Sequence, residues 1–189
     1  MHHLIALATL LPLLAIQEKK TDETFAASLW SRWEPFAEGS SVTTESEFDG
    51  KKSTNTETLV AREKDKLTLE SRHDTTIKGE TKPIVARQFV RPPVAPTPKD
   101  PNAACPGCKK PLKDHKATET TDEKETLTIA KQKLECVKRT FTSYDCQDKT
   151  SSTVIQWLSK EVPGMAVKFE ATGPGDSKRT FVVTEFVKK

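Results

Sequence analysis

The sequence contains none of the residue patterns that mark the common catalytic sites. There is no GxSxG elbow, no HExxH zinc helix, no P-loop and no dinucleotide-binding fingerprint in its 189 residues. After residue 16 only two histidines occur, His73 and His115, and the acidic residues alternate with lysines as they do on a solvated sheet face. We therefore predict that the chain is not an enzyme and has no catalytic residues or organic cofactor.

Clustered basic charge is also absent. The 30 Lys and Arg residues are interleaved with 27 Asp and Glu residues, for a net charge of +3. A nucleic-acid interface needs basic side chains gathered on one surface. We therefore expect no nucleic-acid partner.

No apolar run approaches the length of a membrane-spanning helix. The longest, Leu4 to Ile16, is too short to cross a bilayer and is followed at once by charged residues. It fits the hydrophobic region of a secretory signal with cleavage after Ala15, and the alternative is a buried N-terminal strand or helix. We predict a signal peptide over residues 1–16, no transmembrane segment after its removal, and a secreted or periplasmic protein.

Large aliphatic and aromatic side chains are scarce. Leu, Ile, Val and Phe make up about a fifth of the residues after the leader, a level at which disorder competes with folding. Threonine is abundant, and its branched polar side chain suits the wet face of a pleated sheet. The composition favours thin β structure with one solvated face.

The residues before the first strand predict a helix. Phe25, Leu29 and Trp33 recur every four residues within 21–33, so they share one helix face, and Pro35 ends the pattern. We expect this aromatic stripe to cover the apolar face of a sheet.

Alternating runs predict antiparallel strands in both halves of the chain. Residues 42–48 alternate up to Asp49-Gly50, a strong hairpin signal, and further strands follow up to Val90. Residues 91–118 interrupt the pattern with many prolines and two cysteines, and strands resume after it. We predict two sets of antiparallel strands, one after the helix within 17–90 and one over 119–189, that form one domain around a proline-rich linker or insert.

A few motifs carry a resemblance to a known group. They are Trp33-x-x-Phe36 with Gly39-Ser40, Trp157-Leu158-Ser159, Glu161-Val162-Pro163-Gly164, Val167-Lys168 and the terminal Glu185-Phe186. This arrangement resembles uncharacterised secreted bacterial proteins and, more distantly, the LolA-like lipoprotein-carrier half-barrels. The resemblance implies a mainly β fold, a curved antiparallel sheet around helices, whose concave face holds acyl chains in some relatives. This chain differs in having one clear helix and the central insert.

The four cysteines leave more than one chemistry open. In an oxidising compartment an even number favours disulfides among Cys105, Cys108, Cys136 and Cys146, with Cys105–Cys108 and Cys136–Cys146 the simplest pairing by loop length. A bond from the insert to the sheet, such as Cys108 to Cys136 or Cys146, is an alternative. A dithiol redox site at the CxxC needs a following helix, which the prolines and lysines there do not favour.

The second interpretation of this stretch is a metal site. In CPGCKKPLKDH the thiols of Cys105 and Cys108 and the imidazole of His115 have the spacing of a zinc knuckle, with Gly107 allowing a tight turn. A structural zinc site needs a fourth ligand, for which Cys136, Cys146 and His73 are the candidates. Disulfides are the preferred prediction, and zinc is the alternative.

Three functional hypotheses follow. The first is an exported, non-enzymatic module that binds another envelope or extracellular macromolecule. The second is a carrier of an apolar, lipid-like ligand in a concave sheet. The third is a structural protein whose insert is stapled by zinc.

Overall fold

The structure is a computed structural model, and it describes residues 28–48, 50–77, 80–94, 100–173 and 177–189. The expected signal peptide, residues 1–16, lies outside the described residues. The elements are α1 (Leu29–Trp33), β1 (Ser41–Phe48), β2 (Lys51–Glu63), β3 (Lys66–Ile77), β4 (Glu80–Val90), the 3-10 turn η2 (Leu112–Asp114), β5 (Glu119–Ile129), β6 (Gln132–Tyr144), β7 (Thr150–Leu158), β8 (Ala166–Thr172) and β9 (Lys178–Val187). Within these ranges no helix has the length and apolar character that crossing a membrane requires.

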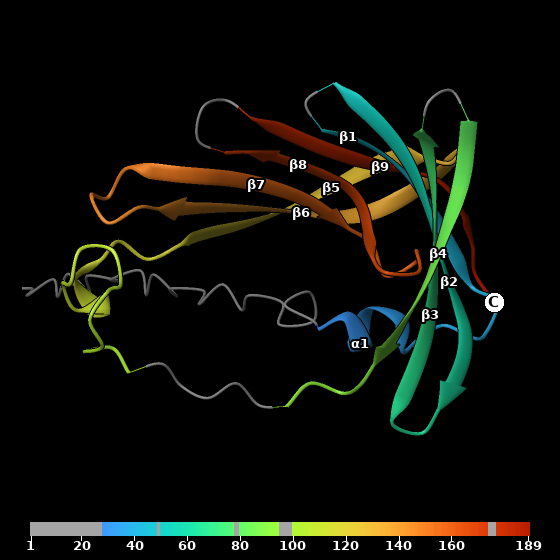
Figure 1. Ribbon diagram of the computed structural model, residues 1–189, viewed down its shortest axis with the longest axis horizontal. Coiled ribbons are helices and arrows are strands. Elements are labelled where there is room, and N and C mark those ends of the chain that lie inside the picture. Colours follow the sequence, from blue (N-terminus) through green and yellow to red (C-terminus); the bar gives the residue numbers. More distant parts are fainter. Residues whose placement is uncertain (1–27, 49, 78–79, 95–99, 174–176) are drawn as a thin grey trace, which may run out of the picture.

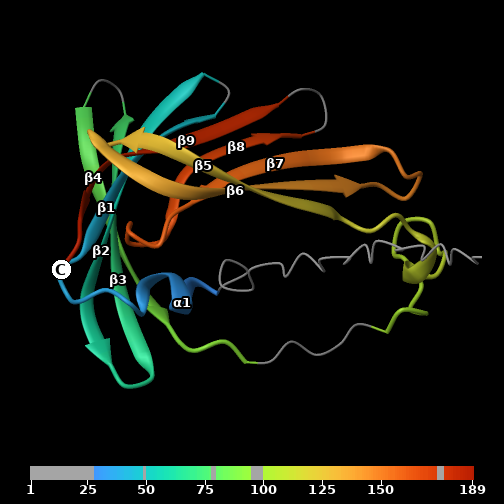
Figure 2. The same ribbon diagram turned by 180° about the vertical axis from the view of Figure 1, so that it is seen from behind.

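All nine strands form one curved antiparallel sheet in the order β4-β3-β2-β1-β9-β8-β7-β6-β5 (Figure 1). The predicted mainly β, half-barrel-like fold is confirmed. Strands β1 to β4 form one wing and β5 to β9 the other, as the view from behind also shows (Figure 2). The wings join where β1 pairs with β9, from Ser41 opposite Val187 to Phe48 opposite Arg179. The two halves of the chain therefore form one continuous sheet.

Tight turns connect the strands much as the sequence predicts. Phe48 pairs with Lys51 across the β1–β2 turn, and Gly50 has a φ of +74°, which glycine adopts without steric cost. The β5–β6 turn is formed by Ala130 and Lys131, both with positive φ.

Helix α1 is shorter than the predicted helix over 21–33. It spans five residues, and residues 21–27 lie outside the described part of the chain. Ser28 ends it on the N-terminal side, since its hydroxyl accepts a hydrogen bond from the Ser31 amide and its ψ of 162° is not helical. A continuous three-turn helix is therefore wrong. The predicted packing role of its aromatic face holds, because Trp33 is completely buried.

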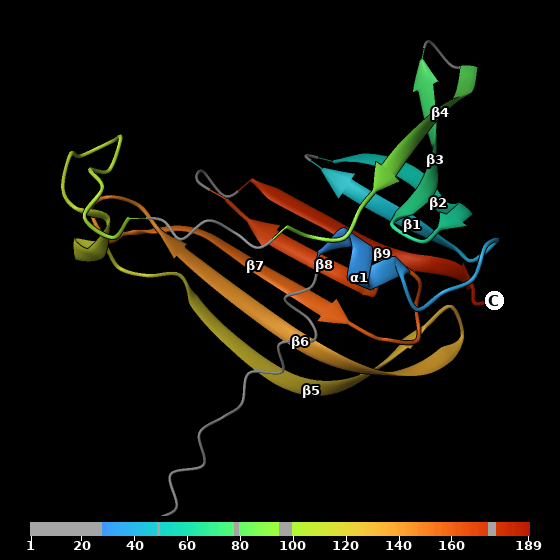
Figure 3. The same cartoon turned by 90° about the horizontal axis from the view of Figure 1, so that it is seen from below.

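The main core lies where α1 and the segment 159–165 pack against the sheet (Figure 3). Trp33 belongs to this core together with Val162 and with Trp157 of β7, so the expected packing of Trp33 against the sheet is confirmed. Gly164, at a φ of +77°, brings the backbone against the indole: a Cβ there would lie 3.4 Å from Trp33 Nε1. Its amide donates to the Arg32 carbonyl at 3.2 Å, which fastens the segment to α1.

The insert connects the two free edges of the sheet. It leaves β4, one edge strand, and returns as β5, the other. Its described residues 100–118 lie beside the end of the β6–β7 hairpin, away from the core at one end of the long axis (Figure 1). Two thiols and an imidazole of the insert are placed there.

Candidate metal centre

The CPGC motif folds as a tight hairpin. The Cys105 amide donates to the Lys110 carbonyl at 2.8 Å, and the Lys109 amide donates back to the Cys105 carbonyl at 2.9 Å. Lys109 has a φ of 65° and makes the reversal. Gly107, predicted to supply the turn, does not have a positive φ. The reversal brings the sulfurs of Cys105 and Cys108 into one cluster.

His115 reaches the same cluster through the 3-10 turn η2. The Leu112 amide donates to the Ala103 carbonyl at 3.0 Å, which ties η2 to the residues just before the knuckle. The His115 amide donates to the Leu112 carbonyl at 3.2 Å and ends the turn. Its Nε2 then lies 3.2 Å from Cys108 Sγ.

The fourth group comes from the β6–β7 turn. Cys146 follows Asp145, whose carboxylate accepts hydrogen bonds from the amides of Gln147 at 2.8 Å and Lys149 at 3.0 Å. These bonds, the Lys149 amide first, lower the pKa of Asp145 and hold the turn in shape. Cys146 Sγ lies 3.2 Å from Cys105 Sγ.

Further contacts hold the insert against this turn. The Lys116 amide donates to Asp148 Oδ1 at 3.0 Å. The Lys116 ammonium lies 3.9 Å from the centre of the Tyr144 ring and 3.0 Å from a Glu119 carboxylate oxygen. Both side chains of that ion pair are about half exposed, so it adds little to stability. The backbone hydrogen bond fixes the register between the insert and the hairpin.

Together these elements form a Cys3His cluster. One ligand atom each from Cys105, Cys108, His115 and Cys146 lies within 4.8 Å of the other three. A tetrahedral zinc ion with Zn–S bonds of about 2.3 Å holds its sulfurs roughly 3.8 Å apart. The four groups therefore have the number, type and spacing of a structural zinc site.

Hydrogen bonds divide the proton affinity of the two close thiols unequally. The backbone amide of Cys108, then the thiol of Cys146 and the amide of Gly107, lower the pKa of Cys105 to about 6. The hydrogen bond to Cys105 raises the pKa of Cys146 to about 11. Cys105 is thus prepared as a thiolate, the form that binds metal, by the amides of its own hairpin.

The remaining candidates for the fourth ligand lie elsewhere. Cys136 is buried in the core, eight residues before the end of β6. At the usual rise per strand residue, this places it about 26 Å from the β6–β7 turn, which begins at that end. His73 is exposed on β3, with Nδ1 3.1 Å from Asn55 Oδ1. Among the three candidates that the sequence offers, only Cys146 joins the cluster.

The structure does not show the preferred disulfides. All four cysteines are free thiols, and even the closest pair, Cys105 and Cys146, is separated by more than an S–S bond of about 2.05 Å. A Cys136–Cys146 bond conflicts with the fold, because Cys136 lies within extended β6, eight residues before its end, and Cys146 lies two residues beyond that end. The same conflict removes a Cys108–Cys136 bond. The sequence alone does not exclude these pairings, because it does not show which end of β6 lies beside the insert.

Gly107 has a role that the sequence analysis missed. A Cβ at this position would lie 3.1 Å from Cys146 Sγ and 3.9 Å from Cys105 Sγ, so the hairpin and the turn can approach only because residue 107 lacks a side chain.

Replacing Gly107 with alanine should therefore weaken metal binding. The added methyl must push Cys146 Sγ by a few tenths of an ångström, and we expect an affinity loss of about tenfold, comparable to that from disturbing a ligand's supporting contacts. Competition with a chelator of known affinity measures it. Lys110→Ala, which changes an exposed side chain of the same hairpin, should leave the affinity unchanged; equal losses in both variants would contradict this role.

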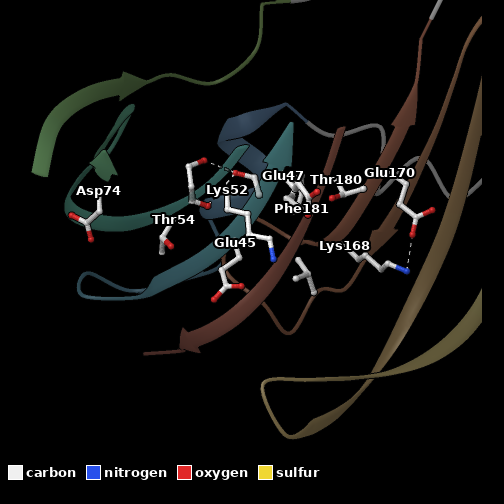
Figure 4. A pocket seen from close by; sticks show the side chains of 12 residues that line it. Glu45, Glu47, Lys52, Thr54, Asp74, Lys168, Glu170, Thr180 and Phe181 are labelled. Carbon is white, nitrogen blue, oxygen red and sulfur yellow. Dashed lines mark hydrogen bonds and ion pairs between the residues drawn. The ribbon is translucent and has the colours of Figure 1, made fainter. Parts of the chain in front are cut away.

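Two larger hollows of the described residues differ in their lining. One of about 670 Å³ lies along β1, β2, β8 and β9 and is lined by Glu45, Glu47, Lys52 and Glu170 among others (Figure 4). Lys168 and Glu170 form an ion pair at 2.8 Å on its wall. A second, of about 330 Å³ beside α1, mixes apolar side chains with Arg32, Glu57 and His73. The charged lining of the first hollow does not favour an acyl chain, and lipid carriage stays a prediction.

Comparison with known proteins gives a fold but no family. No family model and no curated protein matches the sequence. Crystal structures of MucB match with a TM-score of 0.50: MucB alone at 13% identity, and MucB in complex with MucA(peri) at 11%. The Pseudomonas aeruginosa MucA/MucB complex matches equally, also at 11%. The predicted likeness to LolA-like half-barrels is confirmed as a likeness of fold.

The overlap is partial on the MucB side. The match to MucB alone covers 89% of this chain and 60% of that one, and the match to the complex with MucA(peri) covers 87% and 56%. The chain therefore spans a little over half the length of the MucB structures it resembles.

Proposed function

We propose that this chain is an exported, non-enzymatic binding module of the cell envelope, whose insert is stapled to the half-barrel by a structural zinc ion. The observation that carries the proposal is the cluster of Cys105, Cys108 and His115 with Cys146. Three of these groups belong to the insert and one to the β6–β7 turn. A metal bound by all four ties the two together.

The donor set favours zinc in a structural role. Three thiolates and one imidazole complete a tetrahedral shell, and a closed shell leaves no position for the water or substrate that a catalytic zinc requires. Zinc bound in this way contributes its binding free energy to the folded state. The insert has few apolar side chains of its own, so hydrophobic packing alone does not hold it in place. Zinc binding would provide that stabilisation.

A macromolecular partner in the envelope is supported by the fold and the leader. The MucB structures that share this fold include complexes with MucA. The apolar run of Leu4 to Ile16 has the character of an export signal. The charged lining of the hollow along β1, β2, β8 and β9 favours a protein partner over a lipid there.

Metal analysis of the purified chain, combined with thiol counting, tests the staple. We expect one zinc ion per chain, three thiols protected from an alkylating reagent while the metal is bound, and four reactive thiols after chelation and unfolding. Cys136 is the thiol that zinc does not protect, although its burial in the core slows its reaction. Protein that never binds zinc, or that has no reactive thiols in any state, contradicts the proposal.

Cross-linking in envelope extracts tests the binding role. Zinc-loaded protein should capture a partner that a chelated sample and a variant lacking residues 91–118 capture several-fold less. Equal capture by all three samples would mean that the stapled insert has no part in binding.

A further inference from the structure

The two closest sulfurs of the cluster come from different elements. Cys105 Sγ and Cys146 Sγ are 3.2 Å apart, although the residues are 41 positions apart in the chain. Cys108 Sγ lies 3.2 Å from His115 Nε2, and its thiol also interacts with Cys105 and Cys146. The 3.2 Å contact between sulfurs therefore joins the first thiol of the CxxC motif to the distant cysteine.

We infer that Cys105 and Cys146 are a site of oxidative modification, at which a peroxide converts the metal staple into a disulfide staple between the same two elements. The inference rests on the proposed zinc site. It differs from the simplest reading of the sequence, in which Cys105 bonds to its neighbour Cys108. The insert then stays fastened to the β6–β7 turn whether its thiols are reduced or oxidised.

Exposure determines which sulfur reacts first. Cys105 is buried beneath the hairpin, whereas Cys146 is partly exposed at the turn. Gly107 packs closely against both sulfurs, since a Cβ there would lie 3.1 Å from Cys146 Sγ and 3.9 Å from Cys105 Sγ. A small oxidant such as hydrogen peroxide therefore meets Cys146, and Cys105 is the thiol in position to resolve the product.

The chemistry balances with hydrogen peroxide as the only added reagent. The Cys146 sulfur, which zinc holds as a thiolate in the loaded protein, attacks one peroxide oxygen, the O–O bond breaks, and a sulfenic acid and a hydroxide form. The Cys105 thiolate then attacks the Cys146 sulfur, so that the S–S bond forms, the S–O bond breaks and a second hydroxide leaves. Two thiolates lose two electrons in total and peroxide gains them. The metal loses two of its four ligands, keeps only Cys108 and His115, and dissociates.

Peptide mapping after oxidation tests the pairing. The zinc-loaded full chain is treated with one equivalent of hydrogen peroxide, zinc release is followed with a chromogenic chelator, and unreduced tryptic peptides are identified by mass spectrometry. Cys105 and Cys108 share the peptide 100–109, and Cys146 lies in 140–149. We expect these two peptides to be cross-linked, with fragmentation placing the bond on Cys105, at the rate at which zinc is released.

Two variants that each lose one zinc ligand form the matched pair. Cys108→Ser should still form the cross-link at the wild-type rate, and Cys105→Ser should form it at least tenfold more slowly. An internal Cys105–Cys108 disulfide in the wild type, or equal rates in the two variants, would overturn the inference. The same mapping on metal-free protein separates this outcome from a failure of zinc binding, because the pairing depends on the position of the sulfurs and not on the metal.

Discussion

Replacing Cys146 with serine is expected to abolish stoichiometric zinc binding. The variant keeps the knuckle and His115 but removes the only ligand that the β6–β7 turn supplies. A neutral hydroxyl is a far weaker zinc ligand than a thiolate, and the three remaining groups no longer link two elements. We expect the affinity to fall by more than about a hundredfold, beyond the effect of disturbing a ligand's supporting contacts. Chelator competition and metal content after gel filtration measure it.

Cys136→Ala is the matched control, because it also removes one of the four thiols. Cys136 lies in the main core, where burial raises its pKa and keeps it protonated. This variant should retain one zinc ion per chain at wild-type affinity, with at most a small loss of stability. If Cys136→Ala loses zinc and Cys146→Ser does not, the assignment of the fourth ligand is wrong.

Replacing Trp33 with alanine is expected to cost about 3 to 5 kcal/mol of the free energy of unfolding, the range for removing a large buried aromatic side chain. Trp33 is fully buried where α1 meets the sheet, and Gly164 has no side chain that could fill the space. For a domain with so few large apolar groups, this is a large share of its stability. Denaturant unfolding followed by far-ultraviolet circular dichroism measures the change.

Two further substitutions make that result specific. Trp33 Nε1 has no hydrogen-bond partner among the described residues, and a buried unpaired donor costs about 1 to 3 kcal/mol. Trp33→Phe removes this donor and keeps most of the ring, so it should destabilise far less than Trp33→Ala. Trp30→Ala, at a partly buried neighbour in the same helix, should also cost less. A Trp33→Phe variant as unstable as Trp33→Ala would contradict the packing described for α1.

Much of the fold was predictable because the residue pattern within each strand shows which of its faces is buried. The alternation of residues 42–48 and the Asp-Gly corner specify a hairpin within a few residues, and β1 and β2 do pair across that corner, with Phe48 opposite Lys51. The predicted helix was too long because it was based only on apolar residues spaced four apart. That spacing does not show that Ser28, which lies inside the predicted range, caps the N-terminus of α1. The pairing of β1 with β9 has no local signal, since it depends on residues from opposite ends of the chain.

The candidate site was half visible for the same reason. Cys105, Cys108 and His115 lie within eleven residues, and their spacing alone indicates a knuckle. The choice of Cys146 over Cys136 depends on which end of β6 faces the insert, a property of the assembled sheet. The preference for disulfides was based on the expected oxidising compartment. That compartment gives no information on the distance between two cysteine sulfurs in the folded chain. The sequence did offer one signal for Cys146: it lies between Asp145 and Asp148, in a segment typical of a turn.

The ladder between β1 and β9 also determines when the sheet can form. Contacts across it, such as that of the Thr184 hydroxyl with the Thr43 carbonyl, join residues 141 positions apart. Closing so long a loop is slow, and until it closes β1 presents an open row of amides and carbonyls. β1 therefore remains an unpaired edge strand, open to pairing with other chains, until β9 forms. Folding of the sheet is complete only when β9 has paired with β1.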